Sequence, residues 1–359
     1  MKFGILNISK MNVSSIKNGG FEYAELPIEL LDERLKTLEE LDRINLSGVM
    51  VSLKDLDETK LLADLERAQA AGAKYLLIET IGVQEEKLSS IIGKCADKLS
   101  QVDIEIYIEN GVIGDELKGY AYGPYSLASD LQKLVDEYNS LLCKNMFGIS
   151  LNFGYMNLIS KNYRSEIYLA RKNLKHIHIN DNDAIHNDRQ MPYTFTRGRG
   201  QITTDWLRSI GELIRMKYQG WMIFDTVGLW DRSPIELHES FMRLLKSVAD
   251  EWLMQYHLED EVLDNPDKKL ILFGSGAMMK NYLDYFGEKY PPAFVVDNSK
   301  AKWGTTSYGV PVEAPEKILE IPENERTVLL CCGYYTEIGD QLKQMGVEYR
   351  DYIDFYFWV

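Results

Sequence analysis

The feature that most constrains the fold is an alternation of short apolar runs with amphipathic stretches over about the first 250 residues. Eight runs have the length and composition of buried strands. They are Lys2–Ile8, Phe21–Leu26, Ser47–Leu53, Lys74–Thr80, Ile104–Asn110, Phe147–Phe153, Lys175–Asp181 and Gly220–Thr226. Helical patterns lie between most of them, as in Leu30–Leu41, Thr59–Ala73 and Leu127–Leu142. The first connection is short, so any helix there is reduced to about a turn.

Strands separated by helices form right-handed crossovers and a parallel sheet. Eight such units in about 250 residues predict an α/β fold, a (β/α)8 TIM barrel. A doubly wound open sheet is the alternative. The pattern favours the barrel, because the first glycine-rich strand, turn and helix appear only after residue 270.

The chain is too long for one ordinary core, and the pattern restarts near its end. We therefore predict a barrel over residues 1–250, an acidic linker over residues 251–268, and a small Rossmann-like α/β domain over residues 269–359.

Composition excludes several classes of protein. The formal net charge of -15 is repulsive to nucleic acid and to anionic membranes. No apolar stretch is long enough for a bilayer span, and the N-terminus lacks a signal-peptide pattern. The four cysteines have no metal-binding spacing, so we expect reduced thiols in a cytoplasmic protein. A homo-oligomer stays open.

Polar side chains end several of the predicted barrel strands, where the active sites of such barrels lie. Glu109, Asn152, His178 and Asp225 end four consecutive strands, and their ligand types suit a divalent cation. Asp181 lies beside His178. Glu25 and Glu79 end two earlier strands, and for those two we favour helix capping or pairing with lysine over a role in the site.

The motifs "YIEN", "LNFGY", "HIHINDND" and "GWMIFD" resemble those of the xylose isomerase-like TIM barrels. The resemblance implies a divalent metal such as manganese or zinc, held by glutamate, aspartate, histidine and glutamate at four strand ends. Glu109 and His178 match that pattern, whereas Asn152 stands in place of the aspartate and Asp225 in place of the last glutamate. Three carboxylates become two, so we expect a weak, altered metal site or none.

Three arginines fall in the loop after the seventh strand, namely Arg189, Arg197 and Arg199. Arginine pairs with phosphate or carboxylate in bidentate fashion, which favours a phosphorylated or nucleotide-linked substrate. Glu79 and Asp181 are further candidate substrate contacts. A solvated loop that forms salt bridges with neighbouring acids is the alternative.

The C-terminal domain begins with a strand, a turn containing Gly274 and Gly276, and a helix. Asp297 follows about 20 residues later, where a Rossmann-type acid meets ribose. The run after it resembles small Rossmann-like domains of bacterial glycan-modifying enzymes, which implies nucleotide or nucleotide-sugar binding. A tight strand–helix turn followed by an ordinary loop aspartate is the alternative reading.

Together these features predict a sugar or sugar-phosphate isomerase or epimerase in surface-glycan or nucleotide-sugar metabolism. Glu109 and Asp225 would exchange a carbon-bound proton with a small carbohydrate. One alternative is a non-catalytic protein that binds a carbohydrate or nucleotide-sugar and has a degenerate metal site. Another is a metal-independent lyase or epimerase that uses arginine and carboxylates.

Overall fold

The computed structural model describes residues 1–7, 11, 13–40, 44–195 and 204–353. The chain divides into two compact units, Met1–Asp250 and Glu251–Val359, and the division falls within one helix, α10 (His238–Tyr256). Each unit is described by itself. The domain bounds drawn from the sequence, including the linker over residues 251–268, stay a prediction.

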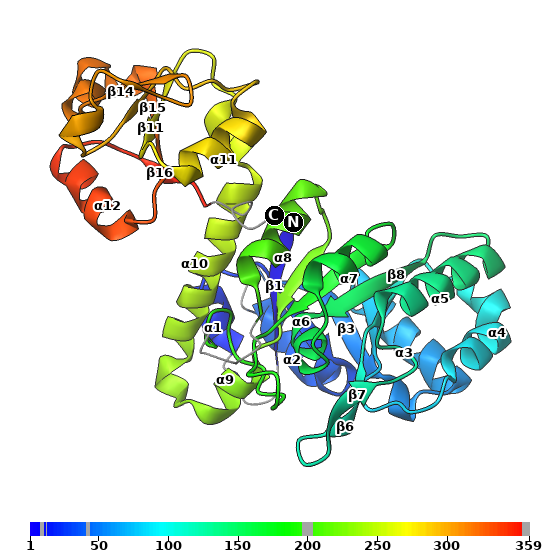
Figure 1. Ribbon diagram of the computed structural model, residues 1–359. Coiled ribbons are helices and arrows are strands. Elements are labelled where there is room, and N and C mark those ends of the chain that lie inside the picture. Colours follow the sequence, from blue (N-terminus) through cyan, green and yellow to red (C-terminus); the bar gives the residue numbers. More distant parts are fainter. Residues whose placement is uncertain (8–10, 12, 41–43, 196–203, 354–359) are drawn as a thin grey trace. The chain divides into compact units, whose positions relative to one another are not determined.

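The first unit contains a closed barrel of parallel strands, which confirms the predicted fold (Figure 1). Its strands are β1 (Lys2–Leu6), β2 (Tyr23–Pro27), β3 (Asn45–Ser52), β4 (Tyr75–Glu79), β5 (Glu105–Glu109), β8 (Phe147–Asn152), β9 (Leu174–Ile179) and β10 (Trp221–Phe224). Around the barrel they follow the order β1-β10-β9-β8-β5-β4-β3-β2. All eight strands predicted from the sequence are present.

Helices connect the strands, as the amphipathic stretches predict. They are α1 (Val13–Asn18), α2 (Leu31–Glu40), α3 (Glu58–Ala70), α4 (Leu88–Leu99), α5 (Ala128–Leu141), α6 (Phe153–Leu158), α7 (Tyr163–Ala170), α8 (Trp206–Arg215), α9 (Val227–Arg232) and α10. Short 3-10 turns lie at Ile28–Leu30, Leu53–Asp55 and Ile235–Leu237. The short α1 fits the short first connection.

A hairpin that the sequence did not predict follows β5. It consists of β6 (Val112–Asp115) and β7 (Gly119–Tyr122), which pair antiparallel. The side chain of Asp115 accepts hydrogen bonds from the backbone N–H groups of Leu117 and Lys118, a common way to hold a tight turn.

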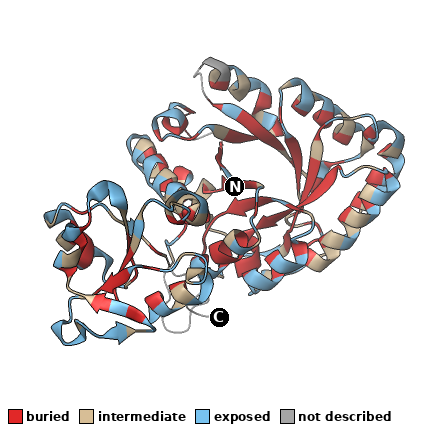
Figure 2. Ribbon diagram, turned by 90° about the horizontal axis from the view of Figure 1, so that it is seen from above, coloured by how far each residue is buried: buried red, intermediate tan, exposed pale blue. Residues whose placement is uncertain are grey.

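The barrel strands are buried, as the red ribbons in Figure 2 show. A cluster of large apolar and aromatic side chains fills part of the barrel interior: Leu6, Tyr75, Leu77, Tyr107, Trp221 and Ile223. The buried polar residues stand out against this core, because burying a polar group is costly unless it finds a partner.

The second unit has a six-stranded sheet in the order β13-β14-β12-β11-β15-β16. Its elements are β11 (Lys269–Phe273), α11 (Ala277–Phe286), β12 (Phe294–Val296), β13 (Thr306–Ser307), β14 (Val310–Glu313), β15 (Arg326–Leu330), α12 (Tyr335–Gln344) and β16 (Arg350–Asp351). A π-helical turn precedes it at Leu258–Leu263, and 3-10 turns lie at Lys300–Lys302, Pro315–Glu320 and Glu323–Glu325. The sheet is mixed, because β13 pairs antiparallel with β14. A C-terminal α/β region is therefore present, and its Rossmann-like character stays a prediction.

None of the helices in the described ranges has the length and hydropathy needed to span a bilayer. The cysteines Cys95, Cys143, Cys331 and Cys332 form no disulfide in the structure, and their reduced state stays a prediction. The cytoplasmic location stays a prediction.

Candidate active site at the barrel mouth

Polar residues gather where the parallel strands of the barrel end. Glu79, Glu109 and Asn152 are the last residues of β4, β5 and β8, and Asp225 directly follows β10. Along β9, His176 and His178 alternate with apolar residues, so both imidazoles lie on one face of the strand. Because the carboxyl ends of parallel strands meet at one edge, these side chains converge.

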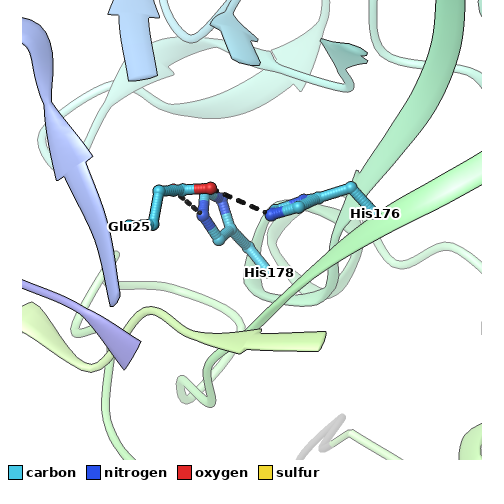
Figure 3. Close-up of side chains that lie close together, drawn as sticks. All are labelled: Glu25, His176 and His178. Carbon is cyan, nitrogen blue, oxygen red and sulfur yellow. Dashed lines mark hydrogen bonds and ion pairs between the residues drawn. The ribbon is translucent and has the colours of Figure 1, made fainter. Parts of the chain in front are cut away.

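The innermost group joins β2 to β9 through one carboxylate (Figure 3). Glu25 Oε2 lies 3.1 Å from His176 Nε2, and Glu25 Oε1 lies 2.8 Å from His178 Nε2. Tyr75 donates its hydroxyl hydrogen to Glu25 Oε2 over 2.7 Å. Each of these side chains is fully buried. We call Glu25, Tyr75, Ser150, His176 and His178 the inner cluster.

Ser150 belongs to the inner cluster through its contact with His176. Together with Glu109, which lies outside the cluster, it completes a loop of contacts. The strand register places Ser150 opposite Glu109 on β5 and opposite His176 on β9. Ser150 Oγ lies 2.8 Å from His176 Nδ1 and 3.4 Å from Glu109 Oε1, while His178 Nδ1 lies 2.5 Å from Glu109 Oε1. Both ring nitrogens of His178 therefore face carboxylates.

Burial and these contacts shift the ionisation of the group. Burial lowers the pKa of His178, but Glu109 and Glu25 outweigh it and hold that pKa well above its ordinary value. Burial raises the pKa of Glu25, but the charges and hydrogen bonds of His178 and His176 lower it overall. Burial lowers the pKa of His176, which favours a neutral imidazole there. For Glu109 burial is the largest cause, and its pKa is raised.

A second layer of contacts lies toward the strand ends. Asn180, just after β9, donates from Nδ2 to Asn152 Oδ1 at 3.0 Å and to Asp225 Oδ2 at 3.3 Å. Asn152 Oδ1 also accepts from the backbone N–H of Tyr155 at 3.3 Å and so caps α6. Gly154 permits this packing, because a Cβ there would lie 1.8 Å from Asn180 Oδ1.

Arg189 joins this layer from the loop after β9. Its guanidinium lies 2.7 Å from Asp225 Oδ2 and 3.6 Å from Glu79 Oε1, and it donates to the hydroxyl of Tyr155 at 3.4 Å. Tyr155 in turn donates to Glu79 Oε1 at 3.2 Å. We call Glu79, Asn152, Asn180, Arg189 and Asp225 the outer ring.

Buried polar atoms without a protein partner are concentrated around this outer ring. Such atoms are uncommon in folded proteins and need an explanation, such as a ligand or ordered water. Within the described ranges they include Asn7 Nδ2 and Oδ1, Glu109 Oε2, Asn110 Nδ2, Asn152 Nδ2, Asn180 Oδ1, Arg189 Nε, Asp225 Oδ1 and Thr226 Oγ1. They come from five strand ends and include both donors and acceptors, as binding of a polyhydroxylated molecule requires.

These residues, as arranged, do not fit the predicted divalent ion. Both ring nitrogens of His178 face carboxylates, and Asn152 Oδ1 already accepts two hydrogen bonds. Asp225 Oδ2 is paired with Arg189. Two separate carboxylate oxygens, Glu109 Oε2 and Asp225 Oδ1, are left. A divalent ion needs several convergent ligands, so this set is too small.

Two other groups of potential metal ligands occur among the described residues, each with its ligand atoms within 4.8 Å of one another. One is the Glu25, His176 and His178 part of the inner cluster. The other is Asp183, His186 and Asp188 in the loop after β9, where Arg232 already pairs with Asp188. Neither group contains Glu109 or Asp225.

Other residues predicted for the site have different surroundings. Asp181 is fully buried and accepts hydrogen bonds from the backbone of Asn182 and Phe195 and from the indole of Trp206. Burial raises its pKa to about 6. Arg197 and Arg199 lie outside the described residues.

In the C-terminal unit, Gly274 follows β11 with a positive φ of 107°, and Gly276 caps α11. Asp297 Oδ2 accepts hydrogen bonds from the backbone and hydroxyl of Ser275 and pairs with Lys302 at 2.9 Å. These contacts lower the pKa of Asp297 to about 2 although burial raises it. Its carboxylate therefore tethers the glycine turn.

Of the inner cluster, sequence reasoning predicted only His178 as a site residue. It favoured helix capping or lysine pairing for Glu25, which is wrong, because Glu25 contacts two histidines and a tyrosine. The same reasoning gave His176 and Asn180 no role. One available signal was the spacing of His176, His178 and Asn180 at alternate positions, which puts all three on one face of the barrel wall.

Comparison with known proteins gives results consistent with the architecture. A family model described as xylose isomerase-like TIM barrel matches residues 16–248. No curated protein matches the chain in sequence.

Similar solved structures include three epimerases. The apo form of 3-keto-D-glucoside 4-epimerase from E. coli is 18% identical with a TM-score of 0.50, and the match covers 69% of this chain and 99% of that one. D-psicose 3-epimerase in the presence of D-fructose is 14% identical with a TM-score of 0.51, covering 70% and 99%. L-ribulose 3-epimerase is 13% identical with a TM-score of 0.53, covering 75% and 100%.

At these identities the structural likeness shows the fold alone. The family match is independent of it and spans more than half of the chain, from α1 to α10. The chain belongs to the xylose isomerase-like TIM barrel family.

Proposed function

We propose that this protein is a sugar isomerase or epimerase-like enzyme that moves a proton at a carbon beside a carbonyl group. One observation carries the proposal. Glu109 and Asp225 are fully buried at the barrel mouth, and each has one oxygen held by the protein and one oxygen without a protein partner among the described residues. A carboxylate fixed in this way can take up or release a proton.

The order of the strands places these two carboxylates at different positions around the barrel, so each would face a substrate from a different direction. Glu109 ends β5 and Asp225 follows β10, and strands β8 and β9 separate them in the barrel. Asn152 ends β8, and Asn180 directly follows β9. Asn152 Nδ2 is an N–H donor without a partner among the described residues, and Asn180 Oδ1 is a carbonyl oxygen without one. A sugar hydroxyl both donates and accepts, so it matches such a pair.

Within this proposal, one carboxylate removes the proton from the carbon and the other returns a proton from another direction. The order of the two roles depends on the sugar. The names of the similar structures describe epimerases of keto sugars, which supports this reaction class.

The proposal extends to a phosphorylated or nucleotide-linked sugar of bacterial surface-glycan metabolism. The sequence resemblance of the C-terminal unit supports this extension, with Gly274, Gly276 and Asp297 as candidate nucleotide contacts. Thermal-shift measurements with UDP-sugars on the wild type and on Asp297→Ala test it. A stabilisation by the nucleotide-sugar that persists unchanged in Asp297→Ala would remove Asp297 from the site.

A non-catalytic carbohydrate-binding protein is the second candidate. The amide at position 152 favours it, together with the poor fit of the described residues to a divalent ion. A binding protein would be stabilised by a sugar without exchanging any carbon-bound proton of that sugar.

Solvent exchange separates the two candidates. The protein is incubated with D-fructose, D-psicose or L-ribulose in D2O, and incorporation of deuterium at carbon is followed by NMR. We expect exchange by the wild type and a loss of about 100-fold or more in Glu109→Gln and in Asp225→Asn. Glu105→Gln, at the other end of β5, is the matched control and keeps its rate. Equal exchange rates in all four proteins would refute the assignment.

A further inference from the structure

Arg189 is held in the outer ring by constraints on both its backbone and its side chain. Its φ of 47° lies in the left-handed region, which a residue with a side chain adopts at a cost. The backbone of the next residue, Gln190, pairs with Asp181 in both directions, and Gly228 donates its N–H to the carbonyl of Arg189. A strained residue fixed by its neighbours in this way is typical of a functional position.

The side chain of Arg189 supplies positive charge where acids converge. Asp225 and Glu79 both lie within salt-bridge distance of its guanidinium, and the side chain is only 18% exposed. Its Nε–H is buried and has no hydrogen-bond partner among the described residues. The guanidinium therefore pairs with the two acids through Nη2 and keeps its Nε–H as a hydrogen-bond donor for a ligand.

We infer that Arg189 takes the place of the divalent cation in this barrel, and that its guanidinium stabilises the oxygen of the reacting carbonyl. The inference rests on the proposed function. It accounts for two features together: the pairing of Asp225 with a protein cation, and an amide at position 152 instead of a third carboxylate. A guanidinium carries one positive charge rather than two, so fewer acids are needed to balance it.

The chemistry balances without a metal or a redox partner. A carboxylate takes the proton from the carbon beside the carbonyl, and the electron pair of that C–H bond forms a C=C bond. The carbonyl π electrons move to oxygen, where N–H donors of Arg189 stabilise the negative charge. In an epimerisation the electrons return from oxygen to re-form the carbonyl, and the same carbon receives a proton from a carboxyl group. In an isomerisation the oxyanion takes the proton of the neighbouring hydroxyl, that hydroxyl oxygen forms the new C=O bond, and the C=C electrons take up a proton from a carboxyl group at the former carbonyl carbon.

Metal binding tests the inference without depending on turnover. The probe is Mn²⁺ alone, measured by the loss of its free EPR signal and by elemental analysis of the purified full-length protein. We expect the wild type to carry no stoichiometric metal and to leave the Mn²⁺ signal unchanged. The variant Asn152→Asp with Arg189→Met frees Asp225 and adds a carboxylate, so we expect it to bind about one Mn²⁺.

Controls separate loss of the arginine from loss of the fold. Removing Arg189 leaves a buried carboxylate unpaired, which can prevent folding, so Asn152→Asp alone is measured as well. With Arg189 in place we expect this single variant to stay free of Mn²⁺. Arg243→Met removes an arginine that pairs with Glu239 on α10, in neither group of potential metal ligands, and it also stays metal-free.

Two metal-binding results would each overturn the inference. One is stoichiometric metal in the wild type that is lost in Asn152→Ala, and the other is a folded double variant that binds no Mn²⁺. Activity gives an independent check, because exchange by the wild type should survive EDTA and fall about 100-fold in Arg189→Lys. Exchange that requires Mn²⁺ would end this inference while leaving the proposed function intact.

Discussion

The inner cluster and the outer ring lie next to each other in one barrel, yet they differ in whether all of their polar side-chain atoms have partners. Within the described chain, every side-chain nitrogen and oxygen of Glu25, Ser150, His176 and His178 has a partner. In the outer ring, Asn152, Asn180, Arg189 and Asp225 each leave one buried atom without a partner.

The contrast separates stability from function. A buried polar network in which every atom has a partner supports the fold, whereas unpartnered buried atoms cost stability until something binds them. Functional sites commonly carry such a cost. We therefore expect substitutions in the inner cluster to reduce stability and substitutions in the outer ring to reduce activity.

The largest effect is expected from Glu25→Gln. This change removes the charge that faces both imidazoles in a fully buried setting, and the loss of one partner of such a group costs about 3–5 kcal/mol. Urea denaturation measures the free energy of unfolding, and the exposed Glu22→Gln on the approach to β2 is the control. If Glu25→Gln unfolded at the same urea concentration as this control, the inner cluster would have no structural role.

A smaller effect concerns Asp181, a buried acid whose carboxylate is hydrogen-bonded but whose pKa is still raised by burial to about 6. The folded protein holds this proton more tightly than the unfolded chain, whose carboxyl has a pKa of about 3.8. Its contribution to stability is therefore fully present below about pH 4 and is lost as the pH rises to about 6. The raised pKa corresponds to about 3 kcal/mol.

Asp181→Asn removes this contribution. We expect the stability of the wild type, relative to this variant, to fall by about 3 kcal/mol between pH 3.5 and pH 7, as measured by denaturation at each pH. Asp183→Asn gives the opposite trend, because contacts with His186 lower the pKa of Asp183 although burial raises it. Parallel pH profiles for the wild type and Asp181→Asn would contradict the expectation.

The smallest effect compares two buried threonines. Thr226 Oγ1 has no partner within the described ranges, whereas Thr204 Oγ1 lies 3.0 Å from the hydroxyl of Tyr163. We expect Thr226→Val to stabilise the fold by about 1 kcal/mol and Thr204→Val to destabilise it by about 1 kcal/mol. Thermal denaturation measures both changes in stability. If the two changes had the same sign, a missing hydrogen-bond partner would not determine the cost of burying a threonine hydroxyl.

The sequence predicts the barrel well and its internal contacts poorly. Strand and helix periodicity is local, so all eight barrel strands and the strand ends that carry Glu109, Asn152, His178 and Asp225 could be found. The contact of Glu25 with His178 joins residues 153 positions apart, and no local pattern encodes it. The pairing of Arg189 with Asp225 depends on a loop backbone with positive φ, which periodicity does not reveal.

Asn152 shows how one residue can fit two interpretations at once. As a strand-end residue it can face a ligand, and as the residue before a helix it can also cap that helix. Its Oδ1 caps α6 and contacts Asn180, while its Nδ2 has no partner among the described residues. The same side chain therefore supports the turn with one atom and offers a donor to a ligand with the other.

The loop of contacts through Ser150 has a consequence for where hydrogens can reside. A serine hydroxyl carries a single hydrogen, yet Ser150 Oγ lies near both His176 Nδ1 and Glu109 Oε1. A neutral His176 that donates from Nε2 to Glu25 must accept at Nδ1, which uses that hydrogen. The heavy atoms of the loop are all within contact distance, but no hydrogen is then left for the 3.4 Å contact between Ser150 Oγ and Glu109 Oε1. The hydrogen bond to His178 then holds Glu109 Oε1 in the loop, while Glu109 Oε2 has no protein partner among the described residues.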